Sequence, residues 1–100
     1  PEDTESIDVE ELSIHPGRHE VTIKGESVDM TYTEFRILQM LASRRGWVFT
    51  RNQLVEGVRK ENYAVTDRVI DFQIVGLRKK LGPCSKYIET VRGVGYRFKE

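Results

Sequence analysis

Apolar residues in this chain follow two different spacings, and the change occurs near residue 30. Before that point they alternate with polar residues in short runs, which are separated by the turn signals His15-Pro16-Gly17-Arg18 and Lys24-Gly25-Glu26. Alternation with a period of two is typical of strands that bury one face. We therefore predict a small antiparallel sheet of three or four strands over Ile7 to Met30.

Beyond the sheet the spacing becomes helical, and capping boxes mark two helix starts. One box is Thr31-Tyr32-Thr33-Glu34, and Thr50-Arg51-Asn52-Gln53 repeats it. In each box, a threonine and a side chain three residues later can satisfy backbone N–H groups that the first turn leaves unpaired. We predict a first helix over about Tyr32–Ser43, stopping near Gly46, and a second over about Arg51–Val58.

A third helix is predicted over about Asp67–Leu81, with Thr66 as its cap and Gly82-Pro83 as its stop. Its apolar residues recur every third or fourth position, which gives a single core stripe. The stripe consists of Ile70, Ile74, Leu77 and Leu81. The opposite face then carries Arg68, Phe72, Val75 and Lys79, and it is flanked by Asp71, Gly76 and Arg78.

The last segment predicts a β-hairpin over Tyr87 to Phe98, with its tip at Arg92-Gly93-Val94-Gly95. The two glycines permit positive φ and a tight reversal. Trp47-Val48-Phe49 is expected to pair with this hairpin as a short strand. A helix with basic residues followed by an arginine-tipped hairpin is how a winged helix-turn-helix holds DNA: the helix enters the major groove and the wing meets phosphates or the minor groove.

Composition limits the other functional classes. One hundred residues make one domain with its own core, and no apolar run approaches the roughly 20 residues that cross a bilayer. The single cysteine, Cys84, has no partner for an intramolecular disulfide or a multi-cysteine metal site. The chain offers no catalytic triad or dyad and no phosphate-binding glycine loop. We expect a cytoplasmic domain that is not an enzyme, needs no cofactor and does not enter a membrane.

Charge is distributed unevenly along the chain although its net value is zero. Residues 1–60 hold 8 Lys and Arg against 11 Asp and Glu, whereas residues 61–100 hold 8 against 5. Such a gradient can present a basic face to nucleic acid at one end of a domain, or it can be ordinary solvated surface.

Four segments together resemble the effector domain of OmpR/PhoB-type two-component response regulators. They are MTYTEFRILQML, FTRNQLVEGV, VTDRVIDFQIVGLRKKLG and IETVRGVGYRF. The resemblance implies an α+β winged helix-turn-helix over residues 7–100, with residues 1–6 as a linker remnant. It also implies a sequence-specific DNA-binding transcriptional regulator whose N-terminal receiver domain is phosphorylated on aspartate, and which forms a homodimer when full length.

The resemblance assigns DNA contacts to particular side chains. Arg51 would meet phosphate at the start of the second helix, and the third helix and the wing would supply the other contacts. The predicted DNA-binding residues are Arg51, Arg68, Phe72, Val75, Arg78, Lys79, Thr90, Arg92 and Tyr96. The loop between the second and third helices would contact RNA polymerase through Lys60, Glu61, Asn62 and Tyr63.

The sequence departs from the family pattern at three positions. Val75 and Gly76 stand where relatives often have two arginines, and Arg59 stands where a tryptophan is common. Arginine is the side chain best suited to bidentate contact with guanine, and a glycine inside a helix costs on the order of 1 kcal/mol relative to alanine. The departures therefore affect the element that is expected to read DNA.

Several of these residues have an alternative interpretation. Asp71 can reach Arg68 within one helix turn, Lys79 complements the helix dipole, and Tyr96 can be a packing residue. Phe72 and Val75 could contact thymine methyl groups, bind a partner protein, or be buried under the wing or against the second helix. The alternative function is accordingly a winged-helix interaction module with weak or lost DNA binding.

Overall fold

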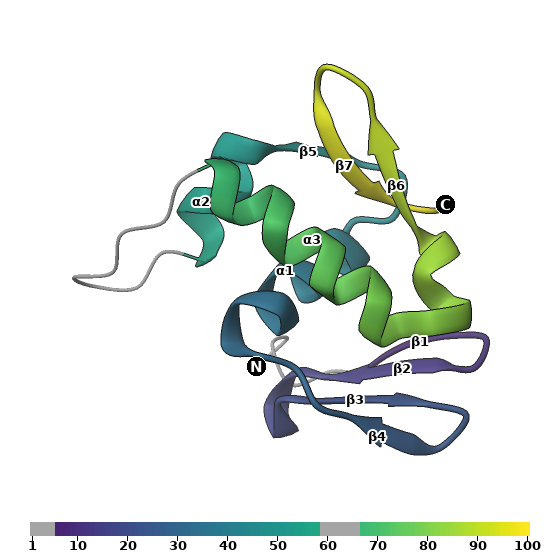
Figure 1. Ribbon diagram of the computed structural model, residues 1–100. Helices are drawn as coiled ribbons and strands as arrows, with labels where there is room; N and C mark the ends of the chain where they lie inside the picture. The colour runs from purple at the N-terminus through teal and green to yellow at the C-terminus, as the bar shows by residue number, and fades with distance from the viewer. Residues whose placement is uncertain (1–5, 59–66) are drawn as a thin grey trace.

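The chain folds as an N-terminal sheet, three helices and a C-terminal hairpin (Figure 1). The computed structural model describes residues 6–58 and 67–100. The predicted α+β arrangement is confirmed within these residues. Four predictions lie wholly or mostly outside the described residues: the cap Thr66, the departure at Arg59, residues 1–5 of the linker, and the loop residues Lys60, Glu61, Asn62 and Tyr63.

Four strands form the N-terminal antiparallel sheet, in the order β1-β2-β3-β4. Their bounds are Ile7–Val9 (β1), Leu12–His15 (β2), Glu20–Ile23 (β3) and Glu26–Val28 (β4). A short 3-10 helix, η2 (Pro16–Arg18), joins β2 to β3. Ile14 lies opposite both Ile7 and Val21, so the alternating apolar residues share one face. Of the predicted three or four strands, the structure has four.

Within the described residues, the bounds of the three helices are those that the sequence predicts. Their bounds are Tyr32–Ser43 (α1), Arg51–Val58 (α2) and Asp67–Leu81 (α3). The Glu34 N–H donates to the Thr31 hydroxyl at 3.1 Å, and the Thr31 N–H donates to Glu34 Oε1 at 2.9 Å. Thr50 and Gln53 make the same reciprocal pair at 2.9 and 3.1 Å. Both predicted capping boxes are thus confirmed.

The C-terminal hairpin belongs to a three-stranded sheet of order β5-β7-β6. The strands are Val48–Thr50 (β5), Ile88–Val91 (β6) and Gly95–Phe98 (β7). Trp47 was predicted as part of β5, but its N–H donates to Arg44 O in a turn and its side chain is 57% exposed. Tyr87 was predicted in the hairpin, but it ends the 3-10 helix η3 (Gly82–Tyr87), where its hydroxyl donates to Glu10 in the turn between β1 and β2.

The two glycines near the wing tip have different roles. Gly93 has φ +77°, which makes the tight reversal as predicted. Gly95 lacks a positive φ, and the prediction that it serves the reversal is wrong. A Cβ at Gly95 would lie 2.0 Å from the backbone oxygen of Phe49, so glycine there allows β7 to approach β5 closely.

The predicted stripe of α3 lies in the core. Ile70, Ile74, Leu77 and Leu81 are each at most 1% exposed. Burying an aliphatic side chain of this size contributes about 1.5–3 kcal/mol, so these four residues fix which face of α3 points outward. In Figure 1, α3 lies between the N-terminal sheet and the hairpin.

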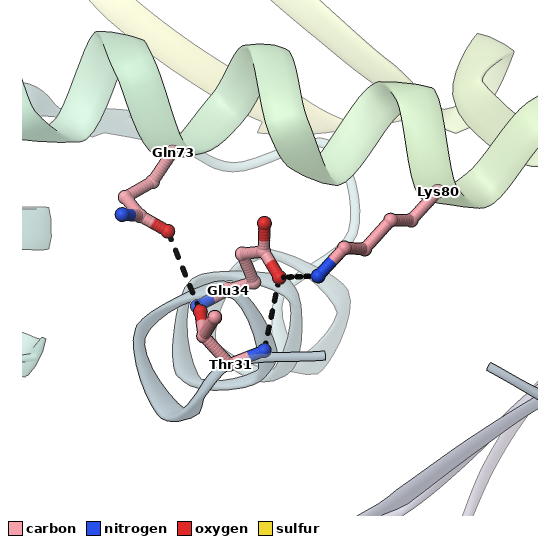
Figure 2. A network of polar contacts seen from close by, with 4 residues as sticks. All are labelled: Thr31, Glu34, Gln73 and Lys80. Carbon is pink, nitrogen blue, oxygen red and sulfur yellow. Dashed lines mark hydrogen bonds and ion pairs between the residues drawn. The ribbon is translucent and has the colours of Figure 1, made fainter. Parts of the chain in front are cut away.

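A polar cluster joins the start of α1 to α3 (Figure 2). Glu34 is 5% exposed and is the buried charged residue of the part of the chain that the structure describes. Its Oε1 accepts from Lys80 Nζ at 2.7 Å, and the Thr31 hydroxyl donates to Gln73 Oε1 at 3.4 Å. Burial would raise the pKa of Glu34, but the hydrogen bonds from Lys80 and the Thr31 backbone outweigh it and lower that pKa from 4.5. Glu34 is therefore ionised at neutral pH.

Gly76 lies directly against this cluster. A Cβ at Gly76 would sit 2.8 Å from Glu34 Oε2, which is closer than real Cβ contacts come. The helix is continuous through Gly76. Glycine at this position therefore accommodates the Glu34 carboxylate against α3, a reason that the sequence does not reveal.

We predict that Lys80→Met destabilises the domain by about 1–3 kcal/mol at pH 7, because it leaves the Glu34 carboxylate without its cation. The folded-state pKa of Glu34 is lowered, so its stabilisation is present above pH 4.5 and is lost as the pH falls through the folded-state value. The difference between wild type and variant should therefore shrink in acid. Urea denaturation at pH 7 and below pH 4 measures both quantities.

Lys79→Met is the matched control, because Lys79 is exposed and lies in the same helix turn. It should change the free energy of unfolding by less than about 0.5 kcal/mol. Equal losses for the two variants, or a Lys80→Met deficit that persists unchanged in acid, would contradict the role assigned to Glu34.

Candidate nucleic-acid interface

The outward face of α3 is the one that the sequence predicts. Phe72 is 75% exposed and Val75 is 64% exposed, and Arg68 and Lys79 on the same face are exposed as well. Burial of Phe72 and Val75 under the wing or against α2 is therefore excluded. Two apolar and two cationic side chains together present apolar and basic groups on one helix face, which suits contact with base edges and phosphates.

The wing presents a cation at its tip. Arg92 is exposed, and the neighbouring Val94 is 47% exposed. The Val94 N–H donates to Val91 O at 2.9 Å, which closes the turn and holds the tip in a defined shape. Thr90, also exposed, lies one position before the turn on β6.

Arg78 connects α3 to the wing. Its Nη2 donates to the Ile88 carbonyl oxygen at 3.0 Å and to the Thr90 hydroxyl at 2.7 Å. Two donations to one strand leave the guanidinium half-buried at the junction of the two elements. The structure thus brings together two predicted site residues, Arg78 and Thr90, and gives Arg78 a definite orientation.

Arg51 is held by a residue that was not assigned a role in DNA contact. Its Nε donates to Asp71 Oδ1 at 2.6 Å, linking the first residue of α2 to α3. The alternative interpretation of Arg68 was a pair with Asp71, but the described ion pair of Asp71 is with Arg51 on another helix. The sequence did contain one indication of a role for Asp71, because it is an acidic residue beside the outward face of a helix with basic residues.

Tyr96 is the third member of this contact. Its hydroxyl donates to the same Asp71 oxygen at 2.6 Å. The Arg51 and Arg78 guanidiniums lie 5.4 and 5.8 Å from its ring centroid, within the range of cation–π attraction. Tyr96 is only 5% exposed, so the structure favours the packing interpretation over a direct contact by its ring. Arg51, Asp71, Arg78 and Tyr96 are called the junction cluster below.

The protonation states in the junction cluster are complementary. The hydrogen bond from Tyr96 and the bonded Arg51 guanidinium hold the pKa of Asp71 below its usual range. Burial, with the hydrogen bond to Asp71, raises the pKa of Tyr96. The Asp71 carboxylate raises the pKa of Arg51. At neutral pH Asp71 is therefore ionised, Tyr96 is a neutral donor and Arg51 is a cation, which is the state in which both hydrogen bonds form.

Other kinds of site find little support in the described part of the chain. Residues 6–58 and 67–100 contain no group of three or more His, Cys, Asp or Glu that could hold a metal ion. Cys84 is buried, and burial raises the pKa of its thiol, which disfavours the reactive thiolate. No helix in these ranges has both the length and the apolar character that a membrane crossing requires.

The chain is similar to known regulatory proteins over most of its length. It is 41% identical over 98 residues to the transcriptional regulatory protein VxrB of Vibrio cholerae, covering 98% of this chain and 39% of VxrB. It is also 41% identical over 100 residues to the phosphate regulon regulatory protein PhoB of Pseudomonas aeruginosa, covering 98% of this chain and 44% of PhoB. The chain thus spans about two fifths of the length of these curated relatives.

A solved structure with the same fold is the DNA-binding domain of RstA from Klebsiella pneumoniae in complex with the RstA box. The TM-score is 0.81 at 34% identity, over 95% of this chain and 97% of that one. Residues 25–98 match the family model described as transcriptional regulatory protein, C terminal. The chain belongs to this family, the winged-helix effector domains of OmpR/PhoB-type response regulators.

Proposed function

We propose that this domain binds double-stranded DNA as the sequence-specific effector of a two-component transcriptional response regulator. The observation that carries the proposal is the outward face of α3, which exposes Arg68, Phe72, Val75 and Lys79. Arg78 joins that face to the wing through Thr90. The RstA domain of the same fold was solved with the RstA box, which supports DNA as the ligand.

In this proposal α3 enters the major groove and the wing lies at the backbone or the minor groove. Arg68 and Lys79 neutralise phosphates, while Phe72 and Val75 contact thymine methyl groups. Arg92 reaches a narrow minor groove or a phosphate. Arg51, Arg78, Thr90 and Tyr96 act from the place where α2, α3, β6 and β7 meet, and of these four residues Arg51 is the one that contacts phosphate.

A second candidate function rests on the same exposed apolar pair. Phe72 and Val75 are large apolar exposures on one helix face, and such a patch can also bind protein. A winged helix that binds a partner protein through this patch would show weak or lost DNA binding. The DNA titration described below separates the two functions.

The whole protein extends the proposal beyond this domain. We infer an N-terminal receiver domain, because the chain spans about two fifths of its curated relatives. Homodimer formation in the full-length protein follows from the family resemblance. Contact with RNA polymerase through Lys60, Glu61, Asn62 and Tyr63 stays a prediction from that resemblance, since these residues lie outside the described structure.

The direct test is titration of the domain against a random duplex library at several salt concentrations. Because each neutralised phosphate releases a counterion, binding should weaken steeply as salt rises. We expect selected sites to bind above background at about 50 mM salt, with modest affinity for the isolated monomer. No binding to any site at that salt concentration would reject the proposal and leave the interaction module.

Arg92→Ala should weaken binding to all sequences nearly equally and reduce the salt slope by about one ion, because readout at the wing is degenerate. Fluorescence titrations of selected and scrambled duplexes measure both effects. Arg18→Ala is the matched control, since Arg18 is an exposed arginine of η2 outside the proposed interface. If Arg92→Ala instead changed the preferred sequence, Arg92 would be reading bases.

Val75→Arg should raise overall affinity and move the selected sequence toward guanine-containing half-sites, because a guanidinium can bond guanine at two atoms. Val75→Lys is the matched control: it adds the same charge without the planar fork and should raise affinity with a smaller change in sequence preference. Selection from a random library with each variant measures the preference. An unchanged motif with Val75→Arg would mean that α3 does not read bases at this position.

A further inference from the structure

Asp71 is an acidic side chain at the edge of a face proposed to meet a polyanion. Its side chain is 47% exposed, so it is not hidden from the approaching ligand. A carboxylate in this position repels phosphates and lowers affinity for any nucleic acid. We therefore expect its contacts to serve a role that offsets this loss of affinity.

The contacts of Asp71 indicate what that role is. One carboxylate oxygen, Oδ1, accepts from Arg51 Nε of α2 and from the Tyr96 hydroxyl of β7, each at 2.6 Å. Asp71 itself belongs to α3. A single atom therefore ties together three elements: the helix proposed to enter the groove, the helix before it and the central strand of the wing sheet.

Two cations lie close to this contact between the three elements. Arg51 and Arg78 both lie against the Tyr96 ring, and Arg78 also donates to Ile88 and Thr90 of β6. The two guanidinium carbons lie 5.4 and 5.8 Å from the centroid of that ring, so two cations lie close to one neutral side chain. The carboxylate balances one of them and fixes the ring by its hydroxyl, so the angle between α3 and the wing depends on it.

We propose that Asp71 is a positioning residue for DNA recognition: by holding Arg51 and Tyr96, it sets the wing relative to α3 and so favours specific over non-specific sites. This inference rests on the proposed function. The two kinds of site should respond in opposite ways when the carboxylate is removed. Removing the carboxylate should strengthen non-specific binding, since one repulsive charge is gone, while it weakens binding to the preferred site.

The experiment compares Asp71→Asn with wild type, using the 100-residue chain and two probes. One is a duplex selected by the wild-type domain from a random library, and the other is a scrambled duplex of equal length. The ratio of the two affinities should fall roughly tenfold in Asp71→Asn, the size of one charge-assisted hydrogen bond. Affinity for the scrambled duplex should rise, because one repulsive charge is gone.

Glu89→Gln is the matched control for charge. Glu89 lies on β6 and pairs with Arg97 at 2.8 Å. Like Asp71→Asn, this variant therefore removes one carboxylate and one ion pair with an arginine, but it does so within the wing. It lies outside the junction cluster, and its ratio of specific to non-specific affinity should equal that of wild type. Tyr96→Phe is the second test variant, because it removes the hydrogen bond from Tyr96 to Asp71 without changing the charge. It should lower the ratio of specific to non-specific affinity without raising the non-specific affinity.

Hydrogen exchange gives a measurement that needs no DNA. Amides of β6, β7 and the turn at Val94 should exchange faster in Asp71→Asn and Tyr96→Phe than in wild type and Glu89→Gln. Amides of the N-terminal sheet should be unchanged, which shows that the fold is intact.

The outcomes separate the two proposals. If wild type binds the selected duplex and Asp71→Asn keeps the wild-type ratio, the positioning role is overturned while DNA binding stands. If wild type binds no duplex, the proposed function fails. If hydrogen exchange of the wing amides is also unchanged in Asp71→Asn and Tyr96→Phe, Asp71 does not hold the wing relative to α3. A lowered ratio with faster wing exchange supports the inference.

Discussion

The fold depends on the burial of one face of α3. Ile70, Ile74, Leu77 and Leu81 are essentially inaccessible to water, and because they recur with the helical period they leave a single orientation for the helix. Everything proposed about recognition follows from that orientation. The residues on the other side are outward-facing because the stripe is inward-facing, not because of any contact of their own.

Polar contacts then fix what burial alone leaves adjustable. Hydrophobic burial is non-directional and tolerates small shifts of a helix along its neighbours. Lys80 is bonded to Glu34 near the end of α3, and Asp71 is bonded to Arg51 and Tyr96 nearer its start. These bonds need particular distances and angles, so α3 is held toward both ends against α1, α2 and β7.

The departures from the family pattern have different physical meanings. Val75 is exposed and makes the outward face less basic, so it bears on what α3 can recognise. Gly76 borders the Glu34 carboxylate, so it leaves room for that carboxylate beside α3. Val75 and Gly76 are neighbours in the sequence, but they lie on two different surfaces of α3, because successive residues are about 100° apart around a helix.

The sequence alone determined the elements. Local signals are strong in this chain: two capping boxes, a regular apolar stripe and a Gly-Pro stop predict the bounds of the three helices within the described residues, since capping and periodicity depend on residues only a few positions apart. The outward exposure of Phe72 and Val75 followed from the same periodicity. The predicted ends of β5 and the hairpin were less accurate, because the Trp47 turn bond and the Tyr87 contact with Glu10 depend on more than the local pattern.

Only the tertiary structure decided which polar residues meet. Spacing along the chain offered Arg68, three residues earlier, as a possible partner of Asp71, yet its described partners are 20 and 25 residues away. Glu34 and Lys80 are separated by 46 residues, and Gly95 takes its meaning from the backbone of Phe49. Spacing along a chain predicts neighbours within one element, but contacts between elements exist only after the core has set their relative positions, and the junction of α2, α3 and the wing consists of such contacts.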